Sequence, residues 1–250
     1  MRWLLAFFVL LWCATPVEAK PRRVLIYTHN GQGYVHENIH ASVDAMTAIA
    51  KRHGFQVDVS DDPAVFTAQN LKHYRVLIFS NTNNQAFVTP AQREAFQHFI
   101  KRGGGLMGIH SAAGSERDWP YFAHVLGGKF LEHPVQQTLT VSLAEPASKI
   151  TKGLPESFKW DDECYFFSDR SPDAKTLLTV DRSKLHGLEK MKLVHPEDSP
   201  ALLPVAWYQS VDGGREFYMG LGHRPESYSD PRLVRLLDQG FKWVARMAHF

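Results

Sequence analysis

Short β-rich runs alternate with amphipathic stretches between residues 23 and 109, and this alternation constrains the fold more than any other feature of the chain. The runs lie at residues 23–28, 56–60, 75–80 and 106–109. Continuous apolar runs of this length suit parallel strands that are buried on both faces. The pattern predicts a doubly wound α/β sheet, mostly parallel, with helices on both faces. Ligands of such sheets bind at the carboxyl ends of the strands.

Helix signals fall between these runs. Residues 36–52 form an amphipathic stretch that Gly54 can end. Thr89 and Gln92 form a capping box around Pro90, which suits the first position of a helix. We therefore expect one helix in each of these two connections.

The second half of the chain carries fewer helix signals. Further β-rich runs lie at residues 137–143, 176–180, 205–209 and 216–221, the last two as a predicted hairpin. Asp230 before Pro231 caps a final helix that reaches about residue 247. Residues 181–200, rich in charge and proline, are expected to form a surface excursion or lid. Because no linker or repeat interrupts the chain, we predict a single domain over residues 20–250.

The charge balance excludes one class of partner. The chain has 250 residues, with 28 lysines and arginines against 26 aspartates and glutamates, and a formal net charge of +2. Nucleic-acid-binding domains are usually strongly basic, so no nucleic-acid partner is expected. A small molecule is the expected partner, and the oligomeric state is left open.

The first 19 residues read as a secretory signal. A short basic start precedes an apolar run at residues 4–12, and a small-residue cleavage site ends at Ala19. The run is shorter than the roughly 20 residues of a membrane span, so export to the periplasm or the medium, without membrane insertion after cleavage, is predicted. An uncleaved anchor or a lipid on Cys13 is the alternative. Cleavage leaves Cys164 as the one cysteine, which excludes an internal disulfide.

The segment GGGLMGIHSAAG at residues 103–114 is the most informative local signal. It places His110 on a tight turn after a strand, as in elbows that lift one side chain into a site. A histidine does not replace a thiol or hydroxyl nucleophile in acyl transfer, so proton transfer or metal binding is indicated. The alternative is that His110 only holds the turn by a hydrogen bond.

Other polar residues border the apolar runs. The predicted acid–base residues are His110, His223 and Glu163. The predicted substrate contacts are His36, His133, Trp119, Tyr121 and Glu226, where the two aromatic rings either stack on a sugar or belong to the core. A divalent metal such as Zn²⁺ would take His110, His133 and His223 as ligands, or His110 with His223 and Glu163. No nucleotide cofactor is expected, because the glycines after the first strand do not form a dinucleotide fingerprint.

Several motifs together resemble the trehalose-utilisation (ThuA-like) family. They are VLIY at 24–27, GGGLMGIH at 103–110, DWPYF at 118–122, LGGKF at 126–130 and GLGHRPESYSDP at 220–231. The resemblance covers nearly all of the chain after the signal and implies the flavodoxin-like fold of the class I glutamine amidotransferase superfamily. His110 stands where an amidotransferase carries its cysteine, so glutaminase chemistry is not implied.

The family resemblance also implies a role in carbohydrate metabolism, on disaccharides or their 3-keto derivatives. The implied activity is that of a hydrolase, lyase or isomerase. The alternative is a non-catalytic sugar-binding protein on the same scaffold, since a fold by itself implies no turnover.

Overall fold

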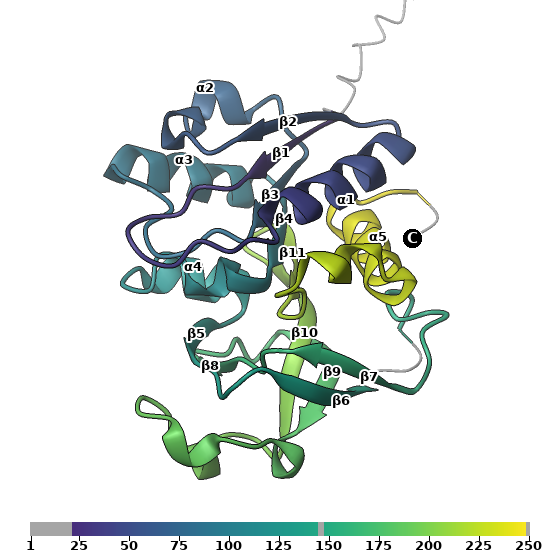
Figure 1. The fold of residues 1–250 in the computed structure, drawn as a ribbon. Coiled ribbons are helices and arrows are strands. Elements are labelled where there is room, and N and C mark those ends of the chain that lie inside the picture. The colour runs from purple at the N-terminus through teal and green to yellow at the C-terminus, as the bar shows by residue number, and fades with distance from the viewer. Residues whose placement is uncertain (1–21, 145–147, 249–250) are drawn as a thin grey trace, which may run out of the picture.

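The computed structural model describes residues 22–144 and 148–248 (Figure 1). The predicted signal, its cleavage site and Cys13 lie outside the described residues. Within the described part of the chain, no helix is long and apolar enough to cross a membrane.

Nine strands form one sheet in the order β2-β1-β3-β4-β11-β10-β9-β6-β7. The first five run parallel: β2 (Gln56–Ser60), β1 (Arg23–Tyr27), β3 (Val76–Ser80), β4 (Gly105–Ile109) and β11 (Gly214–Met219). Their order, with β11 in the fifth place, is that of flavodoxin-like sheets. The predicted fold class is confirmed.

The other four strands extend this sheet in antiparallel fashion, in the lower half of Figure 1. They are β10 (Leu202–Val211), β9 (Lys175–Asp181), β6 (Gln137–Leu143) and β7 (Ser157–Asp162). The predicted hairpin is confirmed as β10 and β11. A second sheet pairs β5 (Lys129–Glu132) with β8 (Phe166–Ser168), and neither these two strands nor β7 was predicted.

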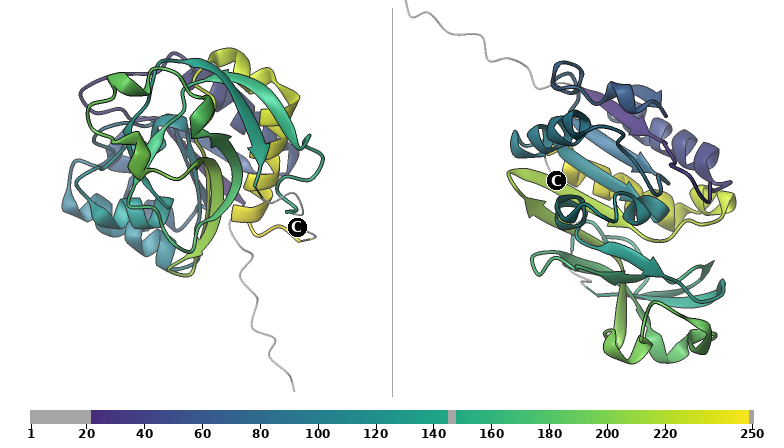
Figure 2. Two further views of the ribbon diagram at one scale, coloured as in Figure 1. Left: turned by 90° about the horizontal axis from the view of Figure 1, so that it is seen from below. Right: turned by 90° about the vertical axis from the view of Figure 1, so that its left-hand side faces the viewer.

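Helices cover both faces of the parallel strands, as the two views in Figure 2 show. On one face lie α1 (Ile39–Arg52) and α5 (Pro231–Val244), and on the other α2 (Ala68–Leu71), α3 (Pro90–Lys101) and α4 (Pro120–Leu126). Successive side chains of β1 point to opposite faces of the sheet. Val24 and Ile26 therefore pack in the core on one face, and Leu25 and Tyr27 in the core on the other. The short helices α2 and α4 were not predicted.

The predicted capping box at α3 is confirmed. The hydroxyl of Thr89 accepts the backbone N–H of Gln92 at 3.3 Å, and the side-chain oxygen of Gln92 accepts the backbone N–H of Thr89 at 3.1 Å. Pro90 occupies the first turn. This local signal therefore fixes where α3 begins.

Residues 182–200 form the predicted excursion, drawn in green at the bottom of Figure 1. It contains three single-turn 3₁₀ helices, Arg182–Lys184, Leu188–Lys190 and Pro196–Asp198. The carboxylate of Glu132 on β5 accepts the backbone N–H groups of Lys192 and Leu193 at 2.9 and 2.8 Å. The excursion is thereby tied to the strand that leads to His133.

Candidate functional site

His110 lies on a sharp turn at the carboxyl end of β4. Its φ is 49°, in the left-handed region that side chains rarely adopt, and the turn continues as a 3₁₀ helix, His110–Gly114. The approach to this turn is tight, since a Cβ on Gly108 would lie 2.5 Å from Leu126 Cδ1. The predicted strand-to-helix turn is confirmed, although the helix is a 3₁₀ helix and not an α-helix.

Hydrogen bonds fix the His110 ring. Its Nδ1 donates to the Gly220 carbonyl at 2.8 Å, so the lone pair of a neutral ring is on Nε2, which accepts the Tyr165 hydroxyl at 2.9 Å. The ring is fully buried. Burial, and then the charge of His36, hold the pKa of His110 well below its usual range. His110 is therefore neutral at physiological pH, as a base or metal ligand must be.

Three further side chains meet His110 from distant parts of the chain. His36 lies in the loop before α1, Glu163 follows β7, and His223 follows β11. The Nε2 of His110 lies 3.4 Å from Nδ1 of His223 and 3.6 Å from Oε2 of Glu163. The same Glu163 oxygen lies 3.4 Å from Nδ1 of His223. One potential ligand atom from each of the four residues lies within 4.8 Å of all the others.

His36 completes this group, and its ring packs edge to face with the ring of His110. The centroids of the two rings are 4.8 Å apart, and the rings are nearly perpendicular at 89°. Burial, followed by the charges of His223 and His133, lowers the pKa of His36 to about 4. Its buried Nδ1 has no hydrogen-bond partner among the described residues. A buried neutral imidazole with an unused nitrogen is an available ligand.

The four residues fit a divalent metal ion. Ligands about 2.1 Å from a tetrahedral Zn²⁺ lie about 3.4 Å from one another, which matches the three distances among His110, His223 and Glu163. Three imidazoles and one carboxylate are also the ligand types that Zn²⁺ takes. Of the predicted ligands, His110, His223 and Glu163 lie within this group and His133 lies outside it. His36, predicted as a substrate contact, lies within the group.

His133 lies on the other side of Glu163. Its Nε2 is 3.5 Å from Oε1 of Glu163, and its Nδ1 is 2.8 Å from the carbonyl oxygen of Pro134, to which it can donate. Its ring stacks on Tyr165 at 5.5 Å. The structure thus places His133 beside the four-residue cluster, with a third of its side chain exposed.

Asp162 was not predicted to have a role, yet it holds two of the cluster residues. Its Oδ1 accepts hydrogen bonds from the backbone N–H groups of Glu163 and His223, at 2.8 and 3.2 Å. Its Oδ2 accepts the backbone N–H of Gly222 and the indole N–H of Trp160, at 2.7 and 2.8 Å. Burial raises the pKa of Asp162 to about 6, although these hydrogen bonds act in the opposite direction. The sequence signal that could have identified it is the acidic group at residues 161–163, which borders an apolar run.

The remaining predicted contacts lie elsewhere. Trp119 packs against Phe87 and Phe96, with centroids 5.9 and 6.1 Å away, and so belongs to the core. Tyr121 packs beside Trp119 at 5.4 Å, and Glu226 is exposed on the 3₁₀ helix Pro225–Ser229. The structure brings none of the three into the four-residue cluster.

Cys164 follows Glu163 in the chain, but its thiol is not a reactive group of the site. It is fully buried, and burial raises the pKa of its thiol to about 12. Such a thiol behaves as a small apolar side chain.

Comparisons with known proteins agree with the sequence motifs. The profile of the ThuA family, described as trehalose utilisation, matches residues 23–244. A ThuA-like protein from Bacteroides uniformis is 27% identical, with a TM-score of 0.70 over 93% of this chain and 95% of that one. A ThuA-like protein from Parabacteroides merdae is 18% identical, with a TM-score of 0.67 over 90% of each chain, and shows the same fold. No curated protein sequence matches. With its profile match running from β1 to the end of α5, this chain belongs to the ThuA family.

Proposed function

We propose that this protein is an exported, metal-dependent enzyme that acts on a disaccharide or its 3-keto form. The observation that carries the proposal is the group of four potential ligand atoms from His36, His110, Glu163 and His223, all within 4.8 Å of one another. The family description, trehalose utilisation, supports a sugar as the substrate class. The position of the cluster, after the carboxyl ends of β4 and β11, is where flavodoxin-like sheets bind ligands.

In this proposal the three histidines of the cluster, with Glu163, hold one divalent ion such as Zn²⁺. Because four protein ligands fill a tetrahedral shell, such an ion would supply Lewis-acid polarisation of a carbonyl or glycosidic oxygen by taking that oxygen as a fifth ligand. The Gly220 carbonyl fixes the ring of His110 so that Nε2 faces the other ligands. Asp162 fixes the backbone of Glu163 and His223. Such support of ligands by hydrogen bonds is typical of functional metal sites.

Proton transfer falls to groups beside the cluster. His133 can donate from Nδ1 to Pro134, which leaves Nε2 for exchange of a proton with substrate. Its partial exposure allows it to reach a sugar that enters from solvent. Tyr165 is completely buried, and burial raises its pKa well above the usual range, so its hydroxyl keeps its proton and acts as a hydrogen-bond donor. With the lone pair of His110 Nε2 bound to an ion, the Tyr165 hydroxyl would lose that acceptor and could donate to the substrate oxygen. These groups suit proton abstraction next to a carbonyl, with His133 as the base and Tyr165 as the donor.

Thiol-based glutaminase chemistry is not proposed. The superfamily's cysteine position is held by His110, and Cys164, the one cysteine in the described part of the chain, is buried with a raised pKa. A buried protonated thiol is a poor nucleophile.

The proposal is tested by metal content and turnover of the purified protein. After exposure to zinc and dialysis, we expect about one zinc per chain, and a loss of most of it in His36→Ala and His223→Ala. His98→Ala, an exposed histidine on α3, is the matched control and should bind as the unaltered protein does. Zinc binding that is the same in all four proteins would contradict the proposed ligands.

Turnover separates an enzyme from a binding protein. Trehalose and 3-keto-trehalose are offered to the zinc-loaded protein and to the chelated protein. We expect turnover of one of them only in the loaded protein, and a loss of turnover in His133→Ala with its zinc retained. Tight sugar binding without turnover in either state would instead favour the non-catalytic sugar-binding protein.

A further inference from the structure

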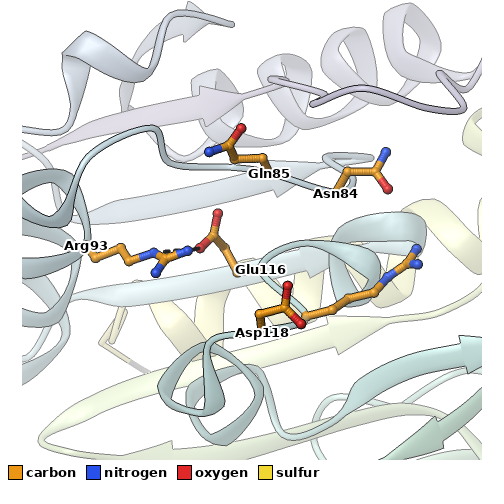
Figure 3. A pocket seen from close by; sticks show the side chains of 6 residues that line it. Asn84, Gln85, Arg93, Glu116 and Asp118 are labelled. Atoms are coloured by element: carbon orange, nitrogen blue, oxygen red, sulfur yellow. Dashed lines mark hydrogen bonds and ion pairs between the residues drawn. The ribbon is translucent and has the colours of Figure 1, made fainter.

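A hollow opens at the edge of the sheet where β3 and β4 end. It has a volume of about 330 Å³ and is lined by Asn84, Gln85, Arg93, Glu116, Arg117 and Asp118 (Figure 3). These residues follow β3 and β4 or, for Arg93, belong to α3. The volume lies at the lower end of the range of small-molecule pockets, roughly 300 to 1,000 Å³. We call this hollow the distal pocket.

Two lines of contacts connect the distal pocket with the metal cluster. The guanidinium of Arg117 lies 5.4 Å from the centroid of the Phe130 ring, which packs 4.3 Å from the ring of Tyr165. Tyr165 in turn donates its hydroxyl to His110. Arg117, in the wall of the pocket, is therefore linked to His110 by contacts through the rings of Phe130 and Tyr165.

The second line of contacts runs through Asn83. Its side-chain oxygen accepts Nη2 of Arg117, and its side-chain nitrogen donates to the Tyr34 carbonyl, both at 3.4 Å. The ring of Tyr34 lies 4.7 Å from that of His36, edge to face, and Tyr34 is 60% exposed. An exposed aromatic ring between two polar sites offers a face for the apolar side of a sugar.

The pocket floor is held by a buried carboxylate. Glu116 is 4% exposed, and its Oε1 accepts the backbone N–H groups of Ala86 and Phe87 at 2.8 and 2.9 Å. Its Oε2 pairs with the guanidinium of Arg93 at 2.6 Å, the contact drawn in Figure 3. Glu116 and Asn84 both have positive φ, 51° and 57°, and are joined by a backbone hydrogen bond of 2.7 Å. The surrounding contacts hold two non-glycine residues in an unfavourable conformation, and so give the pocket a fixed shape.

The charges of the lining select the class of ligand. The positive charges of the two arginines equal the negative charges of the two carboxylates, so the lining has no net charge. Within it, Arg93 and Glu116 form a direct ion pair. The exposed groups that remain are the amide of Gln85, the guanidinium of Arg117 and the carboxylate of Asp118. A phosphate or carboxylate ligand would require an excess of positive charge. Donors and acceptors without net charge suit a neutral polyhydroxylated ring.

We propose that the distal pocket binds the second, non-reacting ring of a disaccharide whose first ring lies at the metal cluster. This inference rests on the proposed function, because it takes the reacting sugar to be at His110 and its neighbours. It adds to that function a preference for a two-ring substrate, set by Gln85, Arg117 and Asp118.

Calorimetric titration with trehalose and with methyl α-glucoside tests the distal pocket, because the first sugar has two rings and the second has one. We expect the unaltered protein to bind trehalose more tightly. Asp118→Ala and Gln85→Ala should each weaken trehalose binding by about tenfold, as expected for lost hydrogen bonds to a sugar, and leave methyl α-glucoside binding unchanged. Asp173→Ala, an exposed carboxylate in the loop before β9, is the control and should change neither affinity.

The outcomes distinguish this inference from the proposed function. Equal affinities for the two sugars, or equal weakening of both in Asp118→Ala, would overturn the distal pocket and leave the metal cluster unaffected. A trehalose preference that depends on Asp118 in a protein without turnover would support the pocket and contradict the enzyme. Binding of neither sugar would overturn the distal pocket and exclude the unoxidised disaccharide as the substrate.

Discussion

Oδ1 of Asp162 accepts the backbone N–H of His223 at 3.2 Å, across 61 positions of the chain. The same atom accepts the N–H of Glu163 at 2.8 Å. One buried carboxylate thus joins the end of β7 to the loop after β11, and each of these segments contributes one residue to the metal cluster. The distance between Glu163 and His223 depends on this bridge.

Asp162→Asn tests the bridge as a positioning element. The asparagine side chain keeps the shape but turns an N–H group toward backbone N–H donors, so the loop after β11 should shift. Outer-shell partners of metal ligands typically account for about 10- to 100-fold in metal affinity, and we expect a loss of zinc affinity in that range. Zinc titration measures it, with Asp173→Asn as the control on an exposed carboxylate. An unchanged affinity in a folded Asp162→Asn protein would show that the bridge does not position the ligands.

His110 provides a second test, which separates catalysis from structure. His110→Ala should abolish turnover and leave a folded protein, and His110→Gln, which retains a hydrogen-bonding side chain, should rescue little. If His110 only holds the turn through Gly220, glutamine should restore stability and alanine should cost about 1 to 3 kcal/mol. Activity would then follow the folded fraction. Melting curves and initial rates on the same two variants decide between these outcomes.

The sequence predicted those parts of the fold that local signals determine. The capping box places the start of α3, and continuous apolar runs mark β1, β3 and β4. The short strands β5 and β8 were missed because their residues show no clean alternation and pair only with each other. Their formation depends on tertiary contacts, which a single sequence does not reveal.

For the candidate site too, the sequence predicted what local signals determine and not what tertiary contacts determine. The turn at His110 was predictable because glycine, a strand and a polar residue lie within a few positions. All four cluster residues were named as site residues, but the complete ligand set was not predictable, since His36, His110, Glu163 and His223 come from four separate segments that no spacing rule connects. The sequence left Trp119 open between a sugar contact and the core, because an aromatic residue near glycines has the same sequence signal in both, and its packing against Phe87 and Phe96 favours the core.

If the protein is exported as proposed, the mature chain should have a defined N-terminus. The apolar run at residues 4–12 and the small-residue site ending at Ala19 indicate cleavage before Lys20. N-terminal sequencing of protein recovered from the periplasm or medium should therefore begin at Lys20. As a control, replacement of Ala19 by a bulky residue should leave an unprocessed precursor. An intact Met1 on protein confined to the cytoplasm would contradict export.

Asp238 on α5 anchors the C-terminal helix to α1 and makes the stability of the protein depend on pH. Its Oδ1 accepts hydrogen bonds from Arg52 at 2.6 Å and His53 at 2.8 Å, and its Oδ2 pairs with Lys242 at 2.7 Å. Burial acts to raise the pKa of Asp238, but the hydrogen bonds from Lys242, Arg52 and His53, with the charge of Lys242, outweigh it and lower the pKa to about 2. The side chain is 12% exposed, so solvent screens this group only weakly.

Removal of the charge should therefore destabilise the protein at neutral pH and have no effect in strong acid. A folded-state pKa of about 2, below the unfolded value of about 3.9, corresponds to roughly 2 to 3 kcal/mol. Because the folded pKa is the lower one, this stabilisation is present above pH 4 or so and is lost as the pH falls through about 2. Denaturant titrations of Asp238→Asn and the unaltered protein should thus differ by roughly 2 to 3 kcal/mol at pH 7 and converge only below the folded-state pKa of about 2. Asp173→Asn should change stability by less than about 0.5 kcal/mol at either pH. A difference that stays constant from pH 7 into acid would show that Asp238 acts through its shape and not through its charge.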